Sequence, residues 1–165
     1  MALTTTIQIL STRATVVGLT TDEAQLTVPV QWKLNDQRTW IAATGAGGIN
    51  AEWPYAVTLA ASSVDFDLTA LTPLLDVAAL ITLNKVRVIA VEASGSNAGA
   101  LTIQPSSGPA NPWAAPFGGP VVIDAGAKIV LTNPSAAGWP VSGGSKVLRI
   151  AGTVGDSFKI YLAGE

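Results

Sequence analysis

Two aspartates separated by a single residue are the strongest candidates for chemistry in this sequence. Asp65 and Asp67 alternate with Val64, Phe66 and Leu68, and this pattern places both carboxylates on one face of a predicted strand. Two carboxylates on one face suit a hard cation or an acid–base pair. Nothing else in the sequence supplies the remaining oxygen ligands or a raised pKa, so we interpret them as the solvent-facing half of an amphipathic strand.

The composition narrows the possible chemistry further. The chain has no histidine and no cysteine, which excludes imidazole bases, His metal sites, disulfides and thiolate metal sites within it. Ser145 lacks the spacing of a nucleophile elbow, and no helix follows the neighbouring glycines as a phosphate loop requires. We therefore predict no enzyme activity, no cofactor and no metal site. The residues leave one kind of enzyme open, a hydrolase that uses only the carboxylates of Asp65 and Asp67.

Aromatic side chains in predicted loops are the candidates for contact with a ligand or partner. Trp113 and Phe117 lie in residues 105–120, a segment rich in proline and glycine, and Trp139 lies in a second large loop. An indole in such a loop either pins the loop or meets a partner, and the sequence does not separate these roles. Stacking on a sugar is a third role for Trp113, Trp139 or Trp53.

Two cations begin the most regular predicted strand. Lys85 and Arg87 alternate with apolar residues in 85–91, so we expect them on a solvated face, with an ion pair between subunits as the alternative. A loop rich in Gly, Ser and Asn separates this segment from a second alternating segment, residues 101–103. Together they predict a β-hairpin over residues 85–104.

The charge content constrains the partners. Charged residues make up 12% of the 165 residues, about half the usual share, and the net charge is −2. The apolar runs are far shorter than the ~20 residues of a membrane-spanning helix, and there is no basic n-region or basic patch. The sequence therefore predicts no membrane and no nucleic acid partner, and a surface that is partly covered by other protein.

The elements that carry these residues are predicted to be short strands. About ten strands at 8–15-residue spacing, without a βαβ signal, predict an all-β fold: an antiparallel two-sheet β-sandwich, jelly-roll-like, with an N-terminal arm or extra strands. Residues 69–77 contain the one plausible helical turn. We expect 1–48 to be packed on or swapped between subunits and 49–165 to form the sandwich, as one compact domain overall. The strands are predicted at residues 4–10, 13–19, 25–33, 38–42, 55–60, 64–68, 85–91, 101–103, 121–123, 128–132, 146–151 and 157–162, with a hairpin over 121–132.

Several segments resemble those of a known family in their order and residue pattern. These segments are residues 65–71, 83–89, 114–119, 126–134, 138–141 and 146–150. Across about residues 50–165 the chain resembles small virion proteins of tailed bacteriophages, namely head decoration (cement) proteins with a jelly-roll or related β-sandwich fold. The resemblance implies a structural role on the capsid surface of the virion after synthesis in the host cytoplasm, often as a homotrimer, with the major capsid protein as partner.

The resemblance also implies that the N-terminal portion takes part in trimer or shell contacts. Strand addition from an arm at residues 1–10 suits this role, because the edges of a sandwich present unpaired backbone groups. We therefore predict Ile7 and Ile9 as partner contacts. Trp113, Phe117 and Trp139 complete this set of candidates. The alternative function is a carbohydrate-binding β-sandwich module of a phage tail or fibre.

Overall fold

The structure is a computed structural model that describes seven ranges of the chain. These are residues 4–8, 15–16, 30–31, 37–41, 48–73, 80–104 and 108–165. The chain divides into two compact units, Met1–Trp40 and Ile41–Glu165. Each unit is described by itself. Ile9 and residues 74–77 of the helical turn predicted at 69–77 lie outside the described residues. The domain boundary predicted at residue 48 and the single compact domain stay predictions.

The first unit contains two pairs of short strands. Their bounds are Thr4–Gln8 (β1), Thr15–Val16 (β2), Val30–Gln31 (β3) and Gln37–Ile41 (β4). β1 pairs with β4, and β2 pairs antiparallel with β3. One pair is therefore nested inside the other, which is the pairing pattern of one long hairpin. Ile7 lies in β1, which pairs with β4 rather than with β2.

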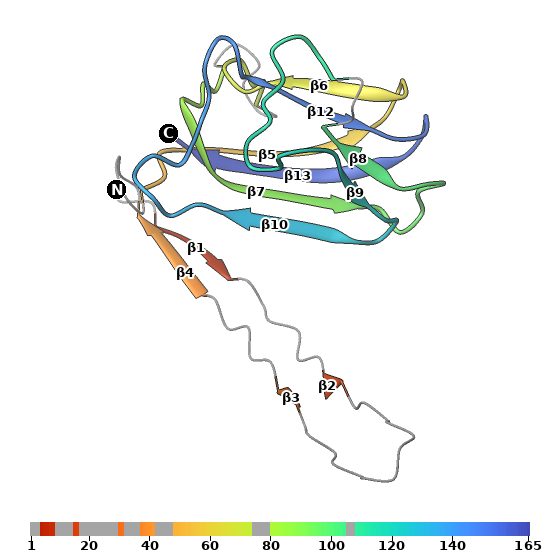
Figure 1. The fold of residues 1–165 in the computed structure, drawn as a ribbon, viewed down its shortest axis with the longest axis horizontal. Helices are drawn as coiled ribbons and strands as arrows, with labels where there is room; N and C mark the ends of the chain where they lie inside the picture. The colour runs from red at the N-terminus through yellow and green to blue at the C-terminus, as the bar shows by residue number, and fades with distance from the viewer. Residues whose placement is uncertain are drawn as a thin grey trace. The chain divides into compact units, whose positions relative to one another are not determined.

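The second unit is a sandwich of two antiparallel sheets (Figure 1). One sheet has the order β10-β7-β13-β5, and the short strand β11 pairs with β7 beyond β10; the other has the order β6-β12-β8-β9. The strands of the first sheet are Ala51–Thr58 (β5), Lys85–Ala93 (β7), Lys128–Thr132 (β10), Trp139–Pro140 (β11) and Ser157–Gly164 (β13). Those of the second are Ser63–Asp67 (β6), Leu101–Ile103 (β8), Val121–Ile123 (β9) and Val147–Ala151 (β12).

The strand pairing makes this sandwich a jelly roll. β8 pairs with β9, β7 with β10, β6 with β12 and β5 with β13, each pair antiparallel. These four pairs are nested in sequence, as if one long hairpin had been rolled so that successive pairs fall in alternate sheets. The predicted all-β, two-sheet jelly-roll sandwich is therefore confirmed.

The two hairpins predicted inside this unit are wrong. β7 and β8 lie in different sheets, and so do β9 and β10. β10 and β13 occupy both edges of β7, which leaves no edge for β8. Alternation of apolar residues shows that one face of a strand is buried, but it does not show which strand lies beside it.

The core lies between the sheets and follows the alternation of the strands. Phe158 of β13 and Phe66 of β6 meet edge-on with ring centroids 6.3 Å apart, and Trp53 of β5 meets Phe66 at 5.3 Å. Burying these aromatic and aliphatic side chains supplies most of the free energy that favours the fold. Other core side chains that are at most 1% exposed include Leu68, Leu83, Val86, Ile89, Val91, Leu101, Ile103, Leu148, Ile150 and Leu162.

The two ends of the sandwich differ (Figure 1). At one end the connections are short, and the buried carboxylate of Asp156 accepts hydrogen bonds from the backbone N–H groups of Ala98 and Thr153, at 2.7 and 2.9 Å. At the other end lie the described parts of the three long connections, which follow β6, β8 and β10. Glu165 lies there too, because its backbone pairs with that of Lys85. We call this second end the broad end.

Candidate functional site

Trp113 joins two long loops at the broad end. Its side chain is 0% exposed, and its Nε1–H donates to the carbonyl oxygen of Pro140 at 3.0 Å. Its backbone N–H donates to the carbonyl oxygen of Val147 at 2.8 Å. The ring of Phe117 stands edge-on to the indole with centroids 6.2 Å apart. Trp113 is therefore the pin of these loops. It contacts Phe117 and holds Pro140, the residue after Trp139, while Phe117 and Trp139 are half-buried against the core.

Gln104 is a second pin that the sequence did not single out. Only 8% of the residue is exposed, and its Nε2 donates to the carbonyl oxygens of Trp113 at 2.6 Å and of Val147 at 2.9 Å. Both amide hydrogens are therefore used, as a buried amide requires. The signal available in the sequence was a polar side chain directly after the apolar alternation of 101–103, at the point where the long loop begins.

The buried side chain of Arg87 holds the second long loop, which follows β10. It is 0% exposed and donates to the carbonyl oxygens of Ser135 and of Ala136, the latter at 3.1 Å, and to Glu165 Oε1 at 2.7 Å. Lys85 Nζ lies 2.9 Å from Glu165 Oε2 and donates to the Ala136 carbonyl oxygen at 3.0 Å. The solvated face predicted for Arg87 is therefore wrong: the guanidinium is a buried clamp between the loop and the end of β13.

A bulge explains why alternation misplaced Arg87. Along the ladder between β13 and β7, Ala163 is opposite Val88 but Gly164 is opposite Val86, so Arg87 is the extra residue of β7. A bulge bends the strand and redirects the side chains that flank it. Gly164 is required at this point, because a Cβ atom there would overlap the carbonyl group of the facing strand. The sequence carries no mark of this irregularity except the glycine.

We define the loop cap as residues 108–120 and 133–145, the parts of the two loops that Trp113 and Arg87 hold in place. Neither segment contains a charged residue. Most of its exposed positions are Gly, Ala, Pro and Ser, while Phe117, Trp139 and Val141 are half-buried against the core. The cap is therefore an uncharged surface, built from irregular backbone that buried polar groups hold in one conformation.

The paired aspartates lie on the outer face of the other sheet, and cations neutralise both. Arg149 Nε and Nη2 donate to Asp65 Oδ1 and Oδ2 at 2.6 and 2.7 Å, and Lys146 Nζ lies 2.6 Å from Asp67 Oδ2. Burial acts to raise the pKa of Asp67, but hydrogen bonds from Lys146 and Thr69 outweigh it, so this pKa lies below its usual value. The interpretation as the outward half of an amphipathic strand is confirmed, and a lowered pKa does not suit a general acid.

Metal binding by clustered acids finds no support in the described part of the chain. Within those ranges no three acidic side chains come together as a group that holds a cation. Nor do the described residues include a helix long and apolar enough to cross a membrane.

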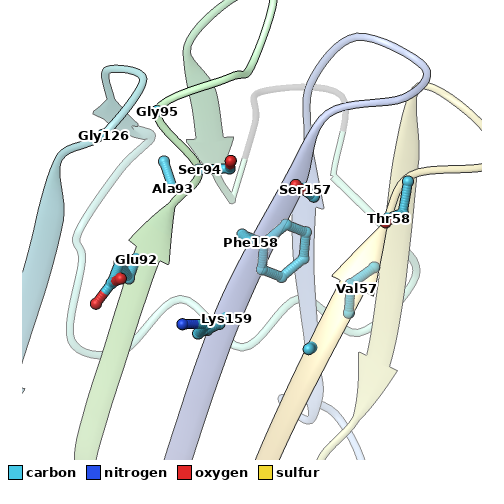
Figure 2. Close-up of a pocket in the computed structure, with 11 residues that line it drawn as sticks. Val57, Thr58, Glu92, Ala93, Ser94, Gly95, Gly126, Ser157, Phe158 and Lys159 are labelled. Atoms are coloured by element: carbon cyan, nitrogen blue, oxygen red, sulfur yellow. The ribbon is translucent and has the colours of Figure 1, made fainter.

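A shallow hollow lies on the outer face of the first sheet (Figure 2). It measures about 450 Å³ and lies where β5 and β7 end and β13 begins. Glu92 of β7 and Lys159 of β13 are opposite each other on its floor, and Glu92 pairs with the exposed Lys128 at 3.2 Å. Exposed pairs of this kind contribute little free energy. The rest of the lining is Phe158, Val57 and small residues, so the hollow lacks the convergent polar groups of a ligand site.

A second hollow of about 330 Å³ lies between the edge strands β5 and β6. The rings of Trp53 and Tyr55 stack along it with centroids 4.9 Å apart. Trp53 is 2% exposed and its Nε1–H donates to the Thr72 carbonyl oxygen at 2.8 Å. A sugar-stacking platform needs an exposed ring face, and neither Trp53 nor Trp113 presents one.

Comparison of the chain with protein-family models, curated proteins and solved structures gives no significant match. The fold is therefore established by strand order and pairing alone, and the function is inferred from the character of the surfaces described above.

Proposed function

We propose that this chain is a structural virion protein that decorates the capsid of a tailed bacteriophage and stabilises it by bridging major capsid protein subunits. The observation that carries this proposal is the loop cap: an uncharged surface at one end of a jelly roll, held in a single conformation by buried groups. Such a surface suits contact with other protein better than it suits chemistry.

The rigidity of the cap supports this proposal. Trp113 within the cap and Gln104 and Arg87 beneath it are each at most 8% exposed. Together they donate hydrogen bonds to backbone carbonyls of both loops. A surface that is already ordered loses little conformational entropy when a partner binds. Irregular loops without such buried groups would lose conformational entropy in every contact that they form. A capsid lattice repeats each contact many times, so this loss would also be repeated.

The strand pairing within the N-terminal unit also supports the proposal. β1, which contains Ile7, pairs with β4, and β2 pairs with β3. Strand edges in that unit would offer backbone hydrogen bonds to a neighbouring subunit.

The carbohydrate-binding alternative has weaker support. It needs an aromatic ring face open to solvent, and among the tryptophans whose side chains the structure describes, Trp139 alone is more than 2% exposed. This ring is itself packed against the core.

Co-sedimentation tests the proposal. Empty, expanded shells assembled from the major capsid protein of the same genome are mixed with the purified chain and pelleted. We expect the chain to pellet with the shells and to saturate at a fixed ratio to capsid subunits, and the loaded shells to resist heat better than bare shells. A chain that stays in the supernatant at every concentration contradicts the proposal.

A further inference from the structure

Apart from the two-residue strand β11, four described strands form the edges of the sandwich. β10 and β5 are the outer strands of the first sheet, and β6 and β9 are those of the second (Figure 1). The residues of an antiparallel strand direct their backbone groups alternately toward the neighbouring strand and away from it. At an edge, the residues directed away can pair with a further strand unless something blocks them.

The free edge of β5 is blocked by a proline. The backbone N–H of Leu59, directly after β5, donates to the Asp156 carbonyl oxygen at 2.8 Å. Alternation along this ladder therefore directs the odd-numbered residues of β5 toward β13 and the even-numbered residues, Pro54 among them, toward the free edge. Because Pro54 has no N–H to donate, a further strand cannot complete a ladder there.

The two edges of the second sheet are unsuitable for other reasons. In β6 the backbone N–H of Leu68 donates to the Lys146 carbonyl oxygen at 2.9 Å, which leaves Asp65 and Asp67 directed toward the free edge. The Asp67 carbonyl oxygen already accepts the N–H of Ala70 at 2.9 Å. Antiparallel pairing of two copies centred on Asp65 would set two carboxylates directly opposite each other. β9 is only three residues long.

The edge of β10 has none of these obstacles. Asn133, directly after β10, donates its backbone N–H to the Arg87 carbonyl oxygen at 2.7 Å. The residues whose backbone groups face the free edge are therefore Lys128, Val130 and Thr132. The strand contains no proline and no glycine, and no other strand of the described residues pairs with this edge. Its one charge, on Lys128, is already in an ion pair within the chain.

We propose that two copies of this chain associate through β10, which pairs antiparallel with β10 of the second copy about a two-fold axis at Val130. This inference does not rest on the proposed function. In this register Val130 lies opposite the second copy's Val130, and Lys128 lies opposite the second copy's Thr132. The outward backbone groups form about six hydrogen bonds between the copies, and the two first sheets become one continuous sheet.

The apolar side chains of β10 favour a second copy as the partner. Ile129 and Leu131 face the core but are only half-buried. The two-fold register sets each Ile129 against the other copy's Leu131, so association removes from water apolar surface that the free chain exposes. β1, the strand proposed above as an arm, has Ile7 as its single apolar residue and would cover less of this surface.

The charges of β10 are also compatible with this register. Antiparallel pairing places the two Lys128 side chains at opposite ends of the contact, each beside a Thr132 hydroxyl. Like charges directly opposite each other destabilise a strand pair, and here none are opposed. Of the four edges, β10 is therefore the one at which two copies can pair without a missing donor or opposed charges.

Sedimentation velocity of the full chain over a range of concentrations tests the inference, and we expect a monomer–dimer equilibrium. Val130→Pro removes the outward N–H at the centre of the contact and leaves the bonds from β10 to β7 in place. We expect this variant to weaken dimerisation at least about 10-fold. Ala56→Pro is the matched control: it makes the same change at the free edge of β5 and should leave the dimer unchanged.

Two charge substitutions at Thr132 test the register without altering the backbone. Thr132→Glu sets a carboxylate opposite the second copy's Lys128, and we expect it to tighten the dimer about 3-fold. Thr132→Lys sets like charges opposite each other and should weaken the dimer by about the same factor. Both effects should shrink at about 1 M sodium chloride, because salt screens exposed charges.

Far-ultraviolet circular dichroism and the urea midpoint show whether each variant is folded; if Val130→Pro does not fold, the two Thr132 variants decide. A chain that is monomeric at every concentration overturns the inference, as does a mass of three chains or a dimer that folded Val130→Pro leaves intact. If the Thr132 variants do not change the affinity in opposite directions, β10 pairs with another strand, such as the uncharged β1, and the inference is wrong.

Discussion

Replacing Trp113 with alanine tests whether this indole is the pin of the loop cap. The side chain is fully buried and its Nε1–H donates to the Pro140 carbonyl oxygen at 3.0 Å. Removing roughly 200 Å² of buried aromatic surface at about 25 cal/mol/Å² costs about 5 kcal/mol. The carbonyl that loses its donor adds about 1 kcal/mol. Trp→Ala substitutions in cores cost about 3–5 kcal/mol, so we expect a loss of about 4–6 kcal/mol in the free energy of unfolding.

Equilibrium urea unfolding, followed by far-ultraviolet circular dichroism, measures this loss. Trp113→Phe is the matched variant: it keeps a ring in the site but removes the N–H donor, so we expect it to cost about 1–2 kcal/mol. Both variants should keep the wild-type dependence of free energy on urea, since the surface exposed on unfolding is nearly unchanged. A cost within about 0.5 kcal/mol for Trp113→Ala is typical of an exposed side chain and would show that this indole is not the pin of the loop cap.

Three further substitutions, one of them with a matched control, probe other contacts of the sandwich. Glu165→Gln leaves the buried guanidinium of Arg87 without its counter-charge, and we expect urea unfolding to show a loss of about 3 kcal/mol or more. Gly164→Ala forces a Cβ atom into the backbone of β7 and should cost at least about 3 kcal/mol, whereas Gly144→Ala, with open space around it, should leave the urea midpoint nearly unchanged. The pKa of Asp67 is lowered in the fold, so its lysine pair stabilises above the unfolded pKa of about 3.9 and is lost as pH falls through the lower folded value. The difference in stability between wild type and Asp67→Asn should therefore shrink below about pH 4; a difference that grows instead would contradict this sign.

Much of the sandwich could be predicted because its strands alternate cleanly. The predicted strands at 101–103, 121–123 and 128–132 match β8, β9 and β10 in their bounds. Alternation also placed Asp65 and Asp67 on an outer face. These features are local, since each follows from the period of the side chains along a single strand.

Strand partners could not be predicted in the same way. β7 and β8 follow one another around a short polar loop, which is the pattern of a hairpin, yet both edges of β7 are taken by β10 and β13. Pairing depends on which apolar faces cover each other across the whole unit, and a local pattern does not contain that information.

The sequence singled out several residues of the candidate site but did not predict their roles. Trp113, Phe117 and Trp139 were singled out because aromatic rings stood in loops of Gly and Pro, and the structure gathers them at the broad end. Arg87 was expected on a solvated face, and Gln104 was not singled out. The bulge that buries Arg87 and the fold that brings Gln104 under the second loop arise only from long-range contacts. The partner contacts predicted for Ile7, Ile9, Trp113, Phe117 and Trp139 stay predictions.

Electron cryomicroscopy of shells saturated with the chain is the direct test of the decoration role. We expect ordered density on the outside of the shell, into which the jelly roll fits with its loop cap in contact with other protein. Shells that carry no added density contradict the decoration role. Added density in which the loop caps are exposed to solvent contradicts the assignment of the cap as the contact surface.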